Sequence, residues 1–301
     1  MIKELITQWI RPLTPRRREQ VMDGLSQAAS PGFDFFLLVL LSGSIATFGL
    51  ITDSAAVIIG AMLIAPLMSP ILALSLSSVN GEPRIYRRAL TALIEGSLLA
   101  VCLSALIAWI TNILPFGFLT ELSGEILSRT HPSPFDLGIA LAGGAAASYA
   151  LAQPYLSAAL PGVAIATALM PPICTVGIGV ALLDWDVAGG AFLLFITNAV
   201  TIAFAAAFVF FLRGFNPYPL DNNRKLPPTL QFSALLIVIL LIPLTYFSID
   251  FVRQASEYRS ISQILNEKVE AINNAELVDF TTNQENETIS IDMTIRTNNP
   301  M

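Results

Sequence analysis

The sequence is short of charged residues. Of its 301 residues, 13% are charged and 54% are hydrophobic, whereas soluble domains carry about 25% charged residues. The apolar residues fall in blocks of about 20, the length that a helix needs to cross the hydrocarbon core of a bilayer. The composition therefore excludes a soluble globular protein. It predicts an all-α polytopic membrane protein whose first partner is the lipid bilayer.

Histidine and cysteine are also scarce. The chain has one histidine, His131, and two cysteines, Cys102 and Cys174, which both lie in apolar spans where cysteine usually packs as a small hydrophobe. This set is too small for a metal-ligand cluster, so we expect no metal and no cofactor. Basic faces interleaved with aromatics are missing too, so we expect no nucleic-acid partner.

Catalytic motifs are missing as well. We find no nucleophile with its base, no phosphate loop and no metalloprotease motif, so we do not expect an enzyme. We also expect no signal peptide, because the first apolar block begins at Phe33 after a long charged lead without a cleavage-like site. What remains to be interpreted is the arrangement of apolar spans.

The lead, residues 1–32, is polar and contains a predicted helix from Pro15 to about residue 29. Thr14 followed by Pro15 is a favourable helix start. The first turn of this helix carries three arginines, Arg16, Arg17 and Arg18. Because positive charge there opposes the helix dipole, we expect another partner for these arginines. Anionic lipid headgroups at the cytoplasmic surface are the plain candidate.

Seven spans are predicted, at about 33–51, 54–79, 89–113, 135–153, 158–182, 188–212 and 230–250. Eleven lysines and arginines fall on one side of the membrane: five in the lead, three in the 80–88 loop (Arg84, Arg87 and Arg88) and three in the 213–229 loop. The opposite loops contain only Arg129. Because basic residues favour cytoplasmic loops, the N-terminus is predicted to be cytoplasmic and the tail extracytoplasmic.

The chain contains a repeat. A shift of 102 residues places Phe33-Asp34 on Phe135-Asp136 and residues 67–71 on residues 169–173 without a gap. The units 33–113 and 135–213 have three spans each, so the second must enter the membrane from the opposite face. Inverted repeats of this kind are typical of many secondary transporters. The alternative is chance recurrence of Leu-Met-x-Pro-Ile in a chain rich in those residues.

Prolines interrupt the middle span of each unit. Pro66 and Pro70 lie in the first unit, and Pro171 and Pro172 lie in the second. Proline inside a helix removes a backbone donor and clashes with the preceding turn, so both spans should bend or break. Freed carbonyls can coordinate a cation, and the following half-helix can hold an anion at its N-terminus. The alternative is a simple kink, satisfied by neighbouring helices or by Ser69 and Thr175.

Glu95 is the sharpest candidate for chemistry. It lies seven residues beyond Arg88, which is about 10 Å into the third span. An acid at that depth usually faces the bundle interior or a water-filled cavity. It is interpreted either as a proton or cation site, or as a structural acid that reaches the interface or pairs with an arginine. The repeat places Thr197-Asn198 opposite Glu95-Gly96, so a polar pocket between these spans is expected.

Three aspartates mark span boundaries. Asp53 precedes the second span and is interpreted as its N-cap rather than as a ligand. Asp34 and Asp136 begin the first and fourth spans and are interpreted as boundary caps.

The composition changes after the seventh span. Residues 254–273 have apolar residues at helical spacing, and residues 276–282 and 287–297 alternate apolar and polar around a predicted turn at 283–286. Residues 251–301 are therefore predicted to form a small extramembrane α-β-β unit. So small a core is expected to pack on a neighbour, on the membrane domain or on further chain.

The residues of the first unit also carry a family resemblance. Stretches 35–50 and 53–71, which include Gly60-Ala-Met-Leu-Ile-Ala-Pro66, resemble the hallmark of an uncharacterised hydrophobic domain of prokaryotic membrane proteins. Ala168-Leu-Met-Pro-Pro172 resembles its second block. The resemblance covers roughly residues 30–215. It implies a multi-pass protein of the prokaryotic inner membrane and supplies no activity.

Three functions remain as hypotheses. The first is a transporter or channel-like protein for a small solute or ion, with its pathway between the units near the proline segments. Glu95 would then be the coupling group and Asn198 a polar partner. The second is a structural or sensory membrane protein, whose spans anchor and oligomerise while its tail binds a partner. A third and weaker hypothesis is an intramembrane enzyme or lipid-handling protein.

Overall fold

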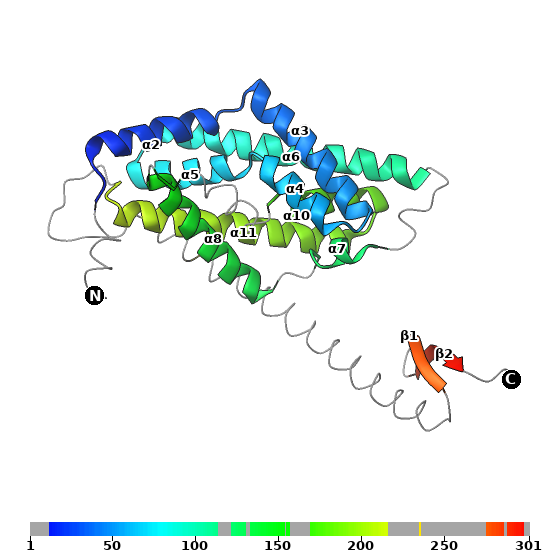
Figure 1. The fold of residues 1–301 in the computed structure, drawn as a ribbon. Helices are drawn as coiled ribbons and strands as arrows, with labels where there is room; N and C mark the ends of the chain where they lie inside the picture. Colours follow the sequence, from blue (N-terminus) through cyan, green and yellow to red (C-terminus); the bar gives the residue numbers. More distant parts are fainter. Residues whose placement is uncertain are drawn as a thin grey trace, which may run out of the picture. The chain divides into compact units, whose positions relative to one another are not determined.

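The computed structural model describes residues 12–113, 122–130, 133–153, 155–156, 169–215 and 235, and the backbone of residues 275–285 and 288–297. The chain divides into two compact units, Met1–Phe247 and Ser248–Met301. The first unit is helical in its described part (Figure 1), and the described part of the second is a β-hairpin.

Short connections join most helices in the described part of the first unit. In chain order the helices are α2 (Pro15–Ala28), α3 (Phe33–Ile51), α4 (Ala55–Ile64), α5 (Met68–Asn80), α6 (Pro83–Ile113), α7 (Gly124–Leu127), α8 (Pro134–Ala152), α10 (Met170–Leu182) and α11 (Trp185–Leu212). Among the described residues, α3, α6, α8 and α11 are each long and apolar enough to cross a membrane. The pair α4 and α5, bent by 48°, makes a fifth candidate span. The chain is therefore a multi-pass membrane protein.

The predicted spans agree with these helices within a few residues, with two exceptions. The third and sixth spans begin earlier than expected, because α6 starts at Pro83 and α11 at Trp185. The seventh span, 230–250, apart from residue 235, and the first half of the fifth, before residue 169, lie outside the described residues. Membrane orientation stays a prediction.

In the described residues, the helices of 33–113 (the first stretch) and of 135–213 (the second stretch) have equivalent bounds within a few residues at the predicted shift of 102. Helix α5 (Met68–Asn80) falls on α10 (Met170–Leu182), and each has 13 residues. Each ends at a residue with left-handed backbone, Gly81 (φ 74°) after α5 and Leu183 (φ 57°) after α10. The helix that follows begins two residues later in both stretches.

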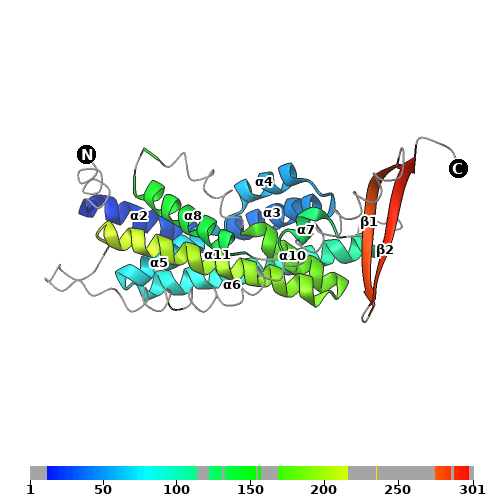
Figure 2. The same ribbon diagram turned by 90° about the horizontal axis from the view of Figure 1, so that it is seen from below.

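The short helices of the two stretches pack on the same two long helices. Helix α5 packs on α6 and α11, and α10 packs on α11 and α6, so the long helices α6 and α11 flank both short ones (Figure 2). Helix α3 packs on α6, and α8 packs on α11. The α8–α11 contact is close, since a Cβ on Gly144 would lie 2.8 Å from the Ile202 backbone. Small residues at such crossings let membrane helices approach closely.

The second unit contains β1 (Ala275–Glu285) and β2 (Thr288–Thr297), which pair antiparallel. The pairing continues to Glu285 opposite Thr288, so the first strand extends through the turn that the sequence predicts at 283–286. A bulge lies between Leu277 and Asp279. The helix predicted over 254–273 lies outside the described residues.

Candidate functional site

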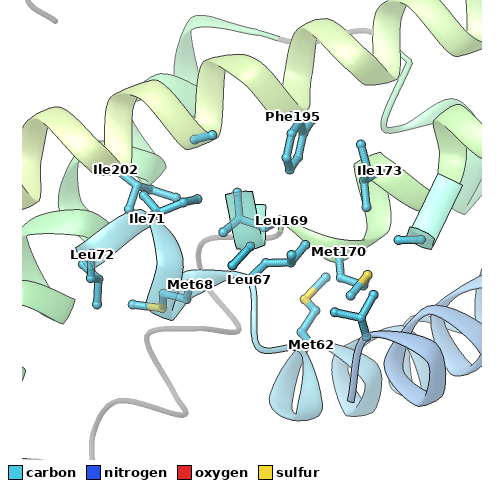
Figure 3. Close-up of a cluster of buried hydrophobic side chains, with 14 of the residues drawn as sticks. Met62, Leu67, Met68, Ile71, Leu72, Leu169, Met170, Ile173, Phe195 and Ile202 are labelled. Atoms are coloured by element: carbon cyan, nitrogen blue, oxygen red, sulfur yellow. The ribbon is translucent and has the colours of Figure 1, made fainter. Parts of the chain in front are cut away.

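The described parts of the two proline segments meet inside the compact unit Met1–Phe247. Leu67 and Met68, at the start of α5, lie beside Leu169 and Met170, at the start of α10 (Figure 3). All four side chains are buried in one hydrophobic cluster. We call this contact the junction; it consists of Leu67, Met68, Leu169 and Met170.

The two short helices run from the junction toward opposite ends of the unit. At the end of α5, Asn80 Nδ2 donates to Met22 Sδ of α2 (2.9 Å), and α2 also reaches Gly214 beyond the end of α11. Helix α10 ends at Leu182, next to the start of α11. Because α11 has 28 residues and is about 42 Å long, these ends are far apart. The N-termini of both short helices, which are the positive ends of their dipoles, therefore face the junction.

The prolines lie where these two helices begin. Pro66 is half-buried in the break between α4 and α5, so the predicted break of the second span is present. Pro70 is buried in the first turn of α5, next to the half-buried Ser69. Pro171 and Pro172 are buried in the first turn of α10. The fixed φ of proline suits a helix start, so these three prolines begin helices rather than kink them.

Asn198 lies on the helix face that covers the junction. Phe195, Asn198 and Ile202 are spaced three and four residues apart on α11 and share one face. Figure 3 shows Phe195 and Ile202 over the junction. Asn198 is 6% exposed, and the neighbouring Thr197 is fully buried. Asn198 is therefore a polar group placed next to an otherwise apolar contact.

Glu95 lies elsewhere. Its side chain is exposed on α6, and it makes no hydrogen bond or ion pair with the described residues. The next residue, Gly96, is buried; a Cβ there would lie 2.9 Å from the Phe35 ring and 3.4 Å from Leu67 Cδ2. Glu95 is thus adjacent in sequence to the packing around Leu67 but is directed away from it. The structure does not bring Glu95 and Asn198 together, because α5 and α10 lie between α6 and α11.

A polar cluster that the sequence analysis missed joins α3, α6 and α10. Thr47 Oγ1 donates to Gly43 O (2.7 Å) and lies 2.6 Å from Ser104 Oγ, while Cys174 Sγ donates to Gly43 O (3.8 Å). All three side chains are fully buried. Interhelical hydrogen bonds between small polar side chains hold membrane helices together. Thr47 and Ser104 in apolar spans were the available signal, but the sequence does not show that they meet.

The aspartates occupy different kinds of position. Asp136 accepts from the N–H and Oγ of Ser133 (2.7 and 2.8 Å) in a capping box at the start of α8. The N-cap of α4 is Ser54, not Asp53 as expected from the sequence; Asp53 instead accepts from Glu125 N (2.8 Å) at the start of α7. Asp34 lies in the first turn of α3, after the N-cap Gly32. Asp53 therefore joins two segments that are 72 residues apart in sequence.

The basic residues also separate into two groups. Arg16, Arg84, Arg87 and Arg88 are exposed, so binding of lipid headgroups stays a prediction for them. Arg17 and Arg18 are half-buried and donate to backbone carbonyls of other segments. Among the described residues, no three His, Cys, Asp or Glu side chains gather as metal ligands would.

Comparison with known proteins gives a family and a relative. Residues 62–204 match the family described as a domain of unknown function, DUF389. The uncharacterized protein MJ0678 of Methanocaldococcus jannaschii is 28% identical over 225 residues, covering 75% of this chain and 68% of that protein. No solved structure matches the chain. The resemblance seen in the sequence is thus confirmed by the match of residues 62–204 to the DUF389 domain of unknown function.

Proposed function

We propose that the chain is a transport protein that moves a small solute or ion across a prokaryotic inner membrane. The observation that carries this proposal is the junction, where two half-length helices meet by their N-termini between α6 and α11. In secondary transporters, discontinuous helices at the interface of inverted repeats present such ends to the substrate. Residues 33–113 and 135–213 are the two inverted repeats in this proposal, and the protein works as a transporter without a catalytic step.

The junction is a closed gate in this proposal. Its four side chains are apolar and buried, and a hydrophobic constriction blocks conduction by excluding water. Separation of α5 from α10 would expose their N-terminal N–H groups and Asn198 to the pathway. The positive ends of two helix dipoles favour an anion or the electron-rich part of a neutral solute.

A flux assay in proteoliposomes tests the gate. Leu169→Ser places a hydroxyl in the junction, so we expect wetting and a flux of the conducted species raised by about tenfold or more. Leu76→Ser is the matched control, because Leu76 is an equally buried leucine of α5 two turns beyond the junction. A panel of small anions, cations and neutral solutes is measured for each protein. Equal flux in both variants would contradict the gate, and no flux in any protein would contradict transport.

Glu95 is proposed separately as the ionisable coupling group. Its exposed side chain on α6 is not engaged by the described residues, so its charge is available for a proton or a cation in this proposal. Glu95→Gln keeps the shape and removes the charge. We expect this variant to retain solute flux and to lose its dependence on a pH or cation gradient; an unchanged dependence would remove Glu95 from the mechanism.

The same junction favours a second candidate, a structural or sensory protein that oligomerises and anchors an external unit. The four side chains of the junction are apolar and pack in one hydrophobic cluster. A contact with a purely structural role would have the same composition. The β-hairpin of the second unit would then bind a partner or an envelope component. A junction that stays impermeable in Leu169→Ser, in a folded and reconstituted protein, would favour this candidate.

A further inference from the structure

Helix α2 carries positive charge at its N-terminal end, where such charge opposes the helix dipole. Arg16, Arg17 and Arg18 lie in its first turn, where the dipole is already positive, and its last turn has no basic residue. Thr14 Oγ1 accepts from Arg17 N at 3.4 Å, which offsets only part of this effect. An isolated α2 would therefore be a weak helix, and its stability has to come from contacts with its neighbours.

Arg17 supplies one of these contacts at the end of α8. Its Nε donates to Ala152 O (3.2 Å) and its Nη2 donates to Leu151 O (3.1 Å). The last carbonyls of a helix have no intrahelical donor and carry the negative end of its dipole. Arg17 thus satisfies two of them at once with a positive charge.

Arg18 makes the corresponding contact beyond the end of α11. Its Nη1 donates to Gly214 O (2.6 Å), and the backbone N–H of Leu13 donates to Arg213 O (3.0 Å). The start of α2 is therefore bound to the ends of both long helices of the second stretch. The charge that destabilises α2 alone stabilises it in this position.

Further along the same face, α2 binds the first stretch. Val21 and Leu25 are buried, and α2 packs on α5. Met22 Sδ accepts from Asn80 Nδ2 (2.9 Å) at the last residue of α5. A single 14-residue helix thus ties the end of α5 to the ends of α8 and α11.

The connection between α2 and α3 is short. Only residues 29–32 separate the helices, and the position of a Cβ on Gly32 meets nothing closer than Ser30 O at 4.0 Å. We propose that α2 is a strap that closes this end of the helical unit, held by Arg17 and Arg18, and that it opens without unfolding the bundle. Its role in gating rests on the proposed transport function, since a path between the two stretches toward this end must pass the strap.

Hydrogen exchange of the full chain in lipid nanodiscs tests the strap directly. In Arg17→Gln/Arg18→Gln, we expect exchange of the α2 amides to accelerate by about tenfold or more, with the interiors of α8 and α11 unchanged. Arg16→Gln is the matched control, because Arg16 lies in the same turn and is exposed. Unchanged exchange in the double variant, equal acceleration in the control, or acceleration throughout the bundle would each overturn the proposal.

A cross-link provides the complementary test. Met22→Cys/Asn80→Cys, with the exposed Cys102 replaced by serine, places two thiols where the side chains now touch. Oxidation should restore slow exchange of α2 in the Arg17→Gln/Arg18→Gln background, and failure to do so would overturn the strap. In proteoliposomes, oxidation should block flux and reductant should restore it. Flux that survives oxidation would overturn gating by the strap, whereas absence of flux in the reduced protein points to failure of the transport proposal instead.

Discussion

Helices α5 and α10 have the same length, the same register at the shift of 102 and the same flanking helices, yet most of their equivalent positions carry different residues. Gly177 of α10 corresponds to Ser75 of α5, and Cys174 corresponds to Leu72. The left-handed residue that ends α10 is Leu183, whereas Gly81 ends α5. The backbone plan is shared by the two stretches, and the side chains that stabilise it are not.

The largest difference is how closely the backbone of each short helix approaches its neighbouring helices. A Cβ on Gly177 would lie 2.5 Å from Val101 O and 2.7 Å from Ser104 Cβ, so α10 and α6 are in backbone contact. Ser75 instead has a buried hydroxyl that donates to Ile71 O of its own helix (2.7 Å). The α10 half is thus closely packed around a glycine, and the α5 half has room for a side chain.

Gly177→Ala should have the largest effect on stability. The new methyl group must displace the α6 backbone, and overpacking of this kind costs about 3 kcal/mol or more when backbone has to move. Ser75→Ala, the equivalent change in α5, removes only one local hydrogen bond and should cost under about 1 kcal/mol. Thermal unfolding in detergent micelles measures both. Equal loss of Tm in the two variants would show that the halves are packed alike.

The helix ends should respond in opposite directions. Leu183 adopts φ 57° and is largely exposed, and left-handed backbone costs a residue with a Cβ about 1 kcal/mol or more. Leu183→Gly should therefore stabilise the chain by about 1 kcal/mol, and Gly81→Ala should destabilise it by a similar amount. The double variant Leu183→Gly/Gly81→Ala combines a stabilising and a destabilising change of similar size. Its Tm should therefore be close to that of the wild type. A loss of stability in Leu183→Gly would mean that its side chain contributes packing that outweighs the backbone strain.

Thr47→Val should have the smallest effect. It removes the hydrogen bond to Ser104 and the bond to Gly43 O, and interhelical bonds in membranes average about 0.6 kcal/mol. Ser44→Ala is the control, because Ser44 Oγ donates only to Leu40 O within α3 (2.8 Å). The equivalents of Thr47, Ser104 and Cys174 are Tyr149, Ala206 and Leu72, so the second stretch has no such cluster to lose. If Ser44→Ala costs as much as Thr47→Val, the cluster does not hold the three helices together.

Local patterns in the sequence were enough for much of the fold. Apolar blocks placed α3 and α8 within a residue of their observed bounds, and the shift of 102 by itself aligned α5 with α10. Thr14-Pro15 marked the start of α2, because a cap and a proline act within one turn. Helix boundaries of this kind depend on neighbours in the chain, which a sequence displays directly.

Contacts between distant segments were not predictable in the same way. Asp53 looked like an N-cap for the residues that follow it, but it accepts from Glu125 N, and the two carbonyls to which Arg17 Nε and Nη2 donate lie more than 130 residues away. Glu95 was placed at a plausible depth, while the direction of its side chain depends on how α6 is rotated against Phe35 and Leu67. A deep acid and a polar partner in equivalent spans do not establish that the two meet.

Helices α5 and α10 begin in the buried interior, so their prolines also affect the number of unpaired backbone donors there. The first four N–H groups of a helix have no intrahelical acceptor, and an unpaired donor in an apolar interior is costly. Pro171 and Pro172 remove two of these four donors at the start of α10, and Pro70 removes one at the start of α5. Proline lowers the number of polar groups that must be desolvated there. Alanine at these positions, usually the better helix former, would add donors to a buried apolar cluster.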